Sequence, residues 1–285
     1  MFRISLVVAI VSASPLCAQE ALRFQWQAGQ SLTYSVQQVI TVTETTLEEG
    51  TNKPVVAATV TKLNLTRRWD VKSVEPSGVA TLEMLILGMK QTINRPGPKD
   101  KDGKPTVDSL VMDSATAEGQ QQMAAYLNKP IVTIKIDAQG KLLEAKSMNT
   151  ASAERLQVEL PFRLTLPDTL PAINGTWDRA FTIKLDPPNG TGEKYDATQT
   201  YTLKGENMGY AVIGVATALK LPPKDPAEMP PLVPYLWDGE VYVQRATNRY
   251  AGARLSVKKE ITNHQGTGSK FTYETTYTEA LAGGK

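Results

Sequence analysis

The stretch LTYSVQQVITVT, residues 32–43, decides the fold, because apolar and polar residues alternate along most of its length. One side of it is formed by Leu32, Tyr34, Val36, Ile40 and Val42. Successive side chains of a β-strand point to opposite faces, so this alternation is typical of a strand with one buried face.

The same period of two returns along the rest of the chain, between turn signals rich in Gly, Asn and Pro. We therefore predict further strands at residues 62–71, 79–89, 131–136, 141–145, 177–185, 195–204, 210–219, 240–247, 253–261 and 270–278. Short connections favour antiparallel pairing over crossovers. The expected fold is mainly β (β-rich α+β), with antiparallel sheets or half-barrels in two similar halves and one or two short helices.

Two segments predict helix. Asp113 or Ser114 can cap a helix near residues 114–128, and residues 151–158 form a weaker candidate. Both are short, so we expect them to be stable only when packed on a sheet.

The chain divides into four parts in this interpretation. Residues 1–18 have the charged, apolar and small-residue order of a signal peptide, and residues 19–160 form an N-terminal β-rich domain. Residues 161–175 form a proline-rich connector that shows no alternation, and residues 176–285 form a C-terminal antiparallel domain. Six prolines in residues 221–234 exclude a regular strand there, and the apolar residues beside them predict a packed cover.

The signal peptide predicts an exported protein, periplasmic or extracellular, with no transmembrane segment after processing. Cleavage after Ala18 would leave a mature chain without cysteine, which excludes disulfides and thiolate sites. Lipid attachment at Cys17 is disfavoured, because such a signal places an apolar residue three positions before its cysteine and a small one directly before it, where this chain has Ser14 and Leu16.

Composition excludes several functions. Lysine and arginine total 31 against 29 acidic residues, so no excess of positive charge indicates a nucleic-acid partner. The single histidine, His264, is predicted to be a surface turn residue and supports neither a triad nor a metal cluster. We expect no cofactor, no metal and no catalytic residue.

Arg67 and Arg68 are adjacent in a strand and should face opposite sides, so they form no joint patch.

Four segments, in this order, resemble a family of exported bacterial β-rich proteins with no known activity. They are LRFQWQAGQSLTYSV at residues 22–36, the pair Asp113 and Ser114, NKPIVTIKIDAQGKLLEAK at residues 128–146, and LPAINGTW at residues 170–177. The resemblance implies export and a β-rich fold, and it implies no catalytic residues. The half-barrel of lipoprotein carriers is a looser architectural likeness, which implies no function.

Three hypotheses follow for function. The leading one is a non-catalytic exported module that binds a partner, such as an envelope protein, or has a structural role. The second is a carrier of an apolar ligand such as a lipid; its candidate binding residues, which can equally fill a solid core, are Met84, Ile86, Met89, Leu232 and Trp237. The third is a hydrolase that uses paired carboxylates, chosen from Glu83, Glu154, Glu159 and Asp178.

Overall fold

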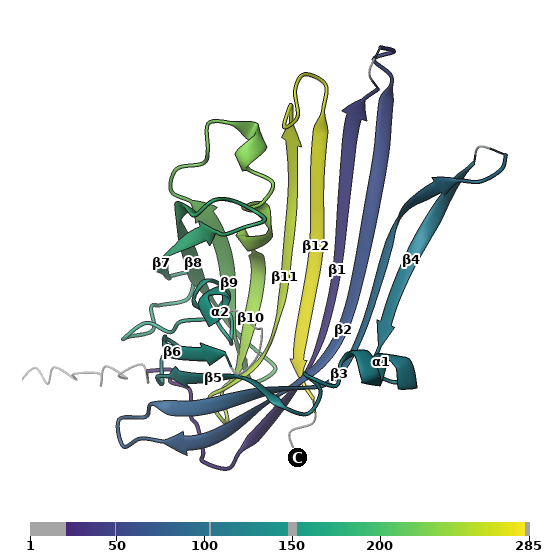
Figure 1. The fold of residues 1–285 in the computed structure, drawn as a ribbon. Helices are drawn as coiled ribbons and strands as arrows, with labels where there is room; N and C mark the ends of the chain where they lie inside the picture. Colours follow the sequence, from purple (N-terminus) through teal and green to yellow (C-terminus); the bar gives the residue numbers. More distant parts are fainter. Residues whose placement is uncertain (1–20, 49, 103, 148–152, 283–285) are drawn as a thin grey trace, which may run out of the picture.

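A computed structural model describes residues 21–48, 50–102, 104–147 and 153–282, and it confirms a mainly β fold (Figure 1). The strands are β1 (Ser31–Leu47), β2 (Pro54–Val74), β3 (Ala80–Lys99), β4 (Pro105–Asp113), β5 (Pro130–Ile136), β6 (Leu142–Ser147), β7 (Thr176–Leu185), β8 (Glu193–Asn207), β9 (Tyr210–Leu219), β10 (Asp238–Gln244), β11 (Arg249–Thr262) and β12 (Lys270–Leu281). The helices are α1 (Ala117–Gln122) and α2 (Ala153–Glu159), with single 3-10 turns at η1 (Pro226–Glu228) and η2 (Val233–Tyr235).

All twelve strands belong to one antiparallel sheet. Eleven of them follow the order β6-β5-β3-β2-β1-β12-β11-β10-β9-β8-β7, and β4 pairs with β3 outside this order. The first and last strands are neighbours in the middle of this sheet, so the two halves of the chain are joined through β1 and β12. The long strand β3 pairs with β5 along its first part and with β4 along its second part. The sheet is not closed into a barrel, and β6 and β7 form its two ends.

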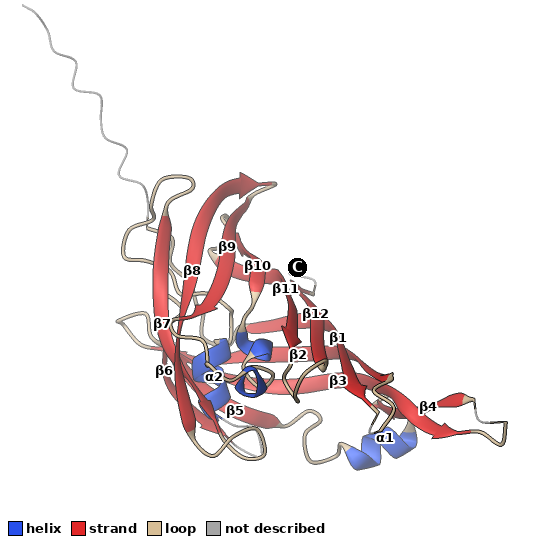
Figure 2. Ribbon diagram, turned by 90° about the horizontal axis from the view of Figure 1, so that it is seen from above, coloured by secondary structure: helices blue, strands red, loops and turns tan. Residues whose placement is uncertain are grey.

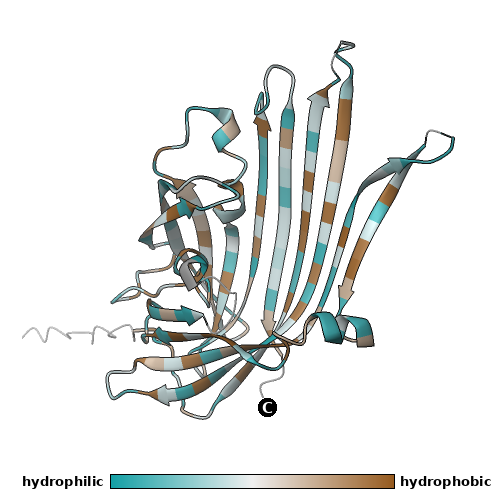
Figure 3. Cartoon of the chain, viewed as in Figure 1, coloured by the Kyte–Doolittle hydropathy of each residue, from teal (hydrophilic) through white to brown (hydrophobic). Residues whose placement is uncertain are grey.

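The sheet is curved, and α2 lies inside the curve (Figure 2). The face of the sheet that carries Tyr34, Trp69 and Tyr277 is called the inner face. All three residues belong to the main buried cluster. Bands of hydrophobic and hydrophilic residues alternate along β1, β2 and β11 (Figure 3), as the period of two requires.

Several strands are longer than predicted, and one strand was missed. β1 and β2 form a hairpin of 17 and 21 residues that turns at Glu48–Lys53, where the amide of Glu48 donates to the carbonyl of Lys53 at 2.8 Å. β4 was not predicted because Val107 and Val111 lie on one face and Leu110 on the other, which removes the alternation.

The predicted helix at residues 114–128 is wrong in its extent, since α1 covers only Ala117–Gln122. Its N-cap is Thr116, whose hydroxyl accepts from the amide of Gly119 at 3.1 Å, and not Asp113 or Ser114. After the helix the chain returns to β3, where Asn128 donates its amide to the carbonyl of Ile86 at 2.8 Å. The second helix is confirmed as α2; residues 151 and 152 of its predicted range lie outside the described residues.

The predicted signal peptide at residues 1–18, with Cys17, also lies outside the described residues. In the described part of the chain, no helix combines the length and the hydropathy that crossing a membrane requires. The division into two domains remains a prediction.

Candidate functional site

The space inside the curve is filled at one end by the chain's own connector. Phe162, Leu164 and Leu166 alternate inward and are 1%, 0% and 2% exposed, so the absence of alternation predicted for this segment is wrong. The prolines at 161, 167 and 171 obscure this pattern in the sequence. We call residues 160–170 the plug.

Phe162 of the plug is the centre of an aromatic cluster. Its ring centre lies 5.2 Å from that of Trp26, 5.6 Å from Trp69 and 5.5 Å from Tyr250. Distances of this size are usual for packed aromatic pairs. The cluster makes this end of the curve a solid core.

The turn between β5 and β6 fixes the other side of the plug. Leu166 donates its amide to the carbonyl of Gln139 at 2.7 Å. Gly140 has φ +83°, and a Cβ there would lie 2.7 Å from the carbonyl oxygen of Leu164 and 2.7 Å from the ring of Phe24. Only glycine therefore allows this close approach.

A buried ion pair lies on the inner face next to the plug. Arg67 on β2 donates Nε to Glu279 on β12 at 2.7 Å, and it also donates to the carbonyl of Pro161 at 3.2 Å. The other carboxylate oxygen of Glu279 accepts from the hydroxyls of Tyr250 at 2.7 Å and Tyr277 at 2.8 Å. All acceptor positions of this carboxylate are therefore used.

The tyrosines of this network are strongly perturbed. Burial raises the pKa of Tyr250 and Tyr277 well above the ordinary value, and the charge of Glu279 raises the pKa of both further. These phenols are held as neutral hydrogen-bond donors. Such a group serves structure and does not act as a base at neutral pH.

A second charged cluster joins α2 to the plug. Glu159 accepts from Arg155 at 2.9 Å and from Arg163 at 3.4 Å. Burial would raise the pKa of Glu159, but Arg163 and Arg155 hold it below its ordinary value. The guanidinium of Arg163 lies over the ring of Tyr277, 4.8 Å from its centre, and 5.7 Å from that of Trp237.

Beyond the plug, the inner face of the long strands carries partly exposed apolar side chains. We call the open apolar face the set on β1, β2 and β3 formed by Ile40, Val42, Leu63, Leu65, Met89 and Ile93. All six are of intermediate exposure, and Ile40, Val42 and Leu65 pack against the main core cluster. The apolar core therefore continues onto the strands that extend past the plug.

The opposite face of the same strands is mostly polar. Gln37, Thr41 and Thr43 alternate with the apolar residues of β1, and Asn64 and Thr66 do so on β2. The open apolar face is thus the side that an antiparallel sheet normally buries.

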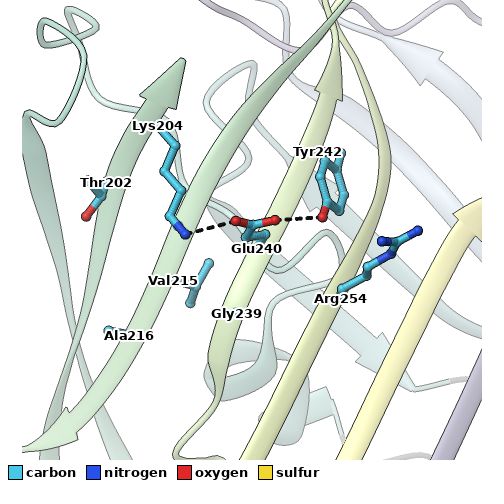
Figure 4. A pocket seen from close by; sticks show the side chains of 9 residues that line it. Thr202, Lys204, Val215, Ala216, Gly239, Glu240, Tyr242 and Arg254 are labelled. Carbon is cyan, nitrogen blue, oxygen red and sulfur yellow. Dashed lines mark hydrogen bonds and ion pairs between the residues drawn. The ribbon is translucent and has the colours of Figure 1, made fainter. Parts of the chain in front are cut away.

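Two cavities lie elsewhere. One, of about 520 Å³, is a groove on the outer face of β8–β11 (Figure 4). In it Glu240 accepts from Lys204 at 2.9 Å and from Tyr242 at 2.8 Å, and these bonds hold the pKa of Glu240 below its ordinary value. This groove is polar, and its carboxylate is already bonded.

The other cavity, of about 960 Å³, lies between α2 and the end strand β7. Arg179 forms part of its wall and donates to the carbonyls of Gln157 and Val158. Burial lowers the pKa of Arg179 by disfavouring its charged form.

The structure places three of the five predicted ligand residues together. Met84, Ile86 and Met89 all face inward, opposite Trp69, Arg67 and Leu65 of β2, because β3 has one extra residue between Ile86 and Met89. A β-bulge of this kind shifts the alternation by one position.

The other two predicted ligand residues lie apart from these and are buried. Leu232 is 0% exposed in a separate cluster with Ile183, Leu185 and Ala197, and Trp237 is 5% exposed against Tyr277. Within the predicted cover at residues 221–234, Leu232 and Val233 are buried, whereas Leu221 is 83% exposed, so packing is seen only in the second part of the segment.

The predicted carboxylates form no common site among the residues whose side chains are described. Glu83 pairs with Lys72 at 3.3 Å, Glu159 belongs to the arginine cluster, and Asp178 lines the cavity beside β7. The side chain of Glu154 lies outside the described part.

His264 lies in the turn before β12, as expected, but the prediction that it is a surface residue is wrong. It is 6% exposed, because its ring packs 5.7 Å from that of Phe271.

Sequence reasoning missed Arg163 and Glu279. Glu279 falls on the inward row of β12 with Phe271, Tyr273 and Tyr277, so its position among aromatic residues was a usable signal. Arg163 had no such signal. Arg67 and Arg68 face opposite sides, as predicted, since Arg67 binds Glu279 while Arg68 binds Asp70 at 2.9 Å.

No protein-family model and no curated protein matches the chain. Among solved structures, the chain is similar to one described as lipid–protein interactions in lipovitellin, with 11% identity and a TM-score of 0.48 over 91% of this chain and 26% of that one. The chain thus spans about a quarter of the lipovitellin chain. It is also similar to DynF from the dynemicin biosynthesis pathway of Micromonospora chersina, with 9% identity and a TM-score of 0.19 over 96% and 92% of the two chains. At these TM-scores neither likeness carries over a function.

Proposed function

We propose that the protein is a non-catalytic binding module whose ligand is an apolar, chain-like molecule such as a lipid tail, held on the open apolar face. One observation carries the proposal: Ile40, Val42 and Leu65 face the concave side, pack against the core, and remain partly exposed. An exposed apolar patch of this kind marks a binding surface in many proteins.

The free-energy gain from covering this face is considerable. Burying apolar surface gains about 25 cal/mol per Å², which is about 1.5–3 kcal/mol for a large side chain moved fully out of water. Six partly exposed side chains each supply a fraction of that amount. Their sum favours binding of a chain-like ligand, although part of it offsets the cost of association.

The proposal includes export and the absence of catalysis. The sequence pattern of residues 1–18 supports export. The burial of His264 against Phe271 and the hydrogen-bonded state of Glu240 and Glu279 support a binding role, since these groups are engaged in structural contacts. Steady turnover by the purified protein in a hydrolase screen would contradict this part.

Uptake of a neutral apolar dye, N-phenyl-1-naphthylamine, tests the binding surface. Ile40→Asp places a carboxylate on the open apolar face and should lower the dye affinity about tenfold or more, since it removes an apolar contact and would bury a charge. Val39→Asp is the matched control, because Val39 is adjacent on β1, points to the opposite face and is 38% exposed.

Thermal melts of both variants show whether each still folds. Native mass spectrometry of protein purified without detergent provides a second measurement, and we expect a bound lipid mass. The proposal is wrong if no dye enters and no lipid co-purifies, or if both variants lose dye binding equally.

A further inference from the structure

Two neighbouring residues at the edge of the plug each have a buried hydrogen-bond donor with no acceptor in the described part of the chain. These donors are Nε of Arg163 and Nε1 of Trp237. Arg163 lies over the rings of both Trp237 and Tyr277, and Trp237 packs against Tyr277 with ring centres 5.9 Å apart. Buried donors in folded proteins nearly always have a partner, so two together indicate a missing acceptor.

The charges around these donors are unbalanced. The plug and its surroundings bring together three arginines and two carboxylates, namely Arg67, Arg155 and Arg163 against Glu159 and Glu279. Glu279 is already filled by Arg67 and two phenols, and Glu159 is shared by two arginines. Arg163 therefore keeps donor capacity and a partly uncompensated charge.

These donors lie at one end of the open apolar face. Tyr277 pairs with Gln38 of β1, and the next inward pair along the same strands is Thr275 with Ile40, where that face begins. The side chain of Arg163 is 12% exposed, so most of it is enclosed, with its guanidinium over the rings of Tyr277 and Trp237. A cationic, donor-rich position thus joins an apolar track.

We propose that the ligand is an anionic amphiphile: its carboxylate or phosphate head accepts from Arg163 and Trp237, and its tail lies along Ile40 and Val42. The inference rests on the proposed function and specifies the ligand class. An anion supplies what both donors lack and offsets the excess of arginine, whereas a neutral alcohol supplies only an acceptor.

A set of probes with one tail tests this. Binding of dodecanoate, dodecyl phosphate and dodecanol to the full mature chain is measured by displacement of N-phenyl-1-naphthylamine, with acetate and inorganic phosphate as anions without a tail. We expect both charged amphiphiles to bind about tenfold tighter than dodecanol, as a charge-assisted bond predicts. We expect the two tail-free ions not to displace the dye.

Two variants locate the head group. Arg163→Gln should lower the affinity for the charged amphiphiles about tenfold and the affinity for dodecanol by a smaller factor, so that the preference for charge is lost. Trp237→Phe keeps the aromatic contact, removes one donor and should reduce the preference by a smaller factor. Arg95→Gln is the control, since Arg95 is an exposed arginine bound to Asp108 at 2.6 Å far along β3. If Arg163→Gln does not fold, the wild-type preference and Trp237→Phe still decide the inference.

The outcomes separate this inference from the proposed function. Equal binding of dodecanoate and dodecanol overturns the head-group inference alone. Displacement by acetate or phosphate at the same concentrations also overturns it, because the site would then hold a free ion. A preference unchanged in both variants overturns the assignment to Arg163 and Trp237. Failure of all amphiphiles to bind overturns the proposed function as well.

Discussion

The buried Arg67–Glu279 pair gives the sharpest prediction of stability. Glu279→Gln keeps the size of the side chain and an oxygen acceptor for Tyr250 and Tyr277, but it removes the negative charge. Arg67 is then left charged with its side chain only 12% exposed. Removing one partner of a buried pair costs about 3–5 kcal/mol, which is a large share of the roughly 5–15 kcal/mol that stabilises a typical domain.

Urea unfolding followed by circular dichroism measures this free energy. The double variant Arg67→Met with Glu279→Gln removes the uncompensated charge, so it should be more stable than Glu279→Gln alone, although the pair is gone in both. Glu274→Gln is the control on the same strand. Glu274 binds Lys258 at 2.6 Å with its side chain 47% exposed, and its loss should change stability by less than about 1 kcal/mol.

Two results would refute this reasoning. A Glu279→Gln variant as stable as Glu274→Gln would mean that solvent screens Arg67 in the folded protein. A double variant less stable than the single one would mean that Arg67 stabilises the plug through its bond to the carbonyl of Pro161 more than its unpaired charge costs.

Three further predictions concern the plug and its surroundings. Phe162→Ala should lower the free energy of unfolding by about 3–5 kcal/mol in urea titrations, because it opens a cavity among aromatic rings, whereas Ile173→Ala at a position 62% exposed should change it by less than about 0.5 kcal/mol. Burial raises the pKa of Tyr201 to about 12. The stability that this phenol contributes is therefore present below about pH 10 and lost as the pH rises toward 12. In Tyr201→Phe, the urea concentration at the unfolding midpoint should depend less on pH over that range. Because the pKa of Glu159 is lowered in the folded protein, its contribution to stability is present above the ordinary glutamate pKa of about 4.3 and lost as the pH falls through the folded value. Glu159→Gln should remove this loss of stability in acid. An unchanged dependence of stability on pH would contradict the prediction.

Alternation along single strands could be predicted from the sequence because it is a local property. Residues 32–43 fall within β1, and their inward row is Leu32, Tyr34 and Val36, as the pattern indicates. Strand ends were less accurate: β2 begins at Pro54, where Val55 and Val56 are exposed and no burial pattern marks the start.

The contacts that build the candidate site are not local, so the sequence shows little of them. Arg67 and Glu279 are 212 residues apart, and only the pairing of β1 with both β2 and β12 brings them together. Phe162 is buried because the sheet curves around it. A segment flanked by prolines carries no signal of that curvature.

The lengths of the plug and of β1 explain why one part of the inner face is filled and another part is open. The plug has 11 residues, and on β1 it lies over the first part of the strand, where Leu32, Tyr34 and Val36 are buried. β1 continues for 10 residues from Gln38 to Leu47, which at about 3.4 Å per residue is roughly 30 Å of strand beyond that contact. The hydrocarbon of one bilayer leaflet is about 15 Å thick, half of a core of about 30 Å. The open stretch is therefore long enough for a lipid tail, and a longer plug would remove it, so lengthening the plug by several apolar residues should reduce dye binding while raising stability.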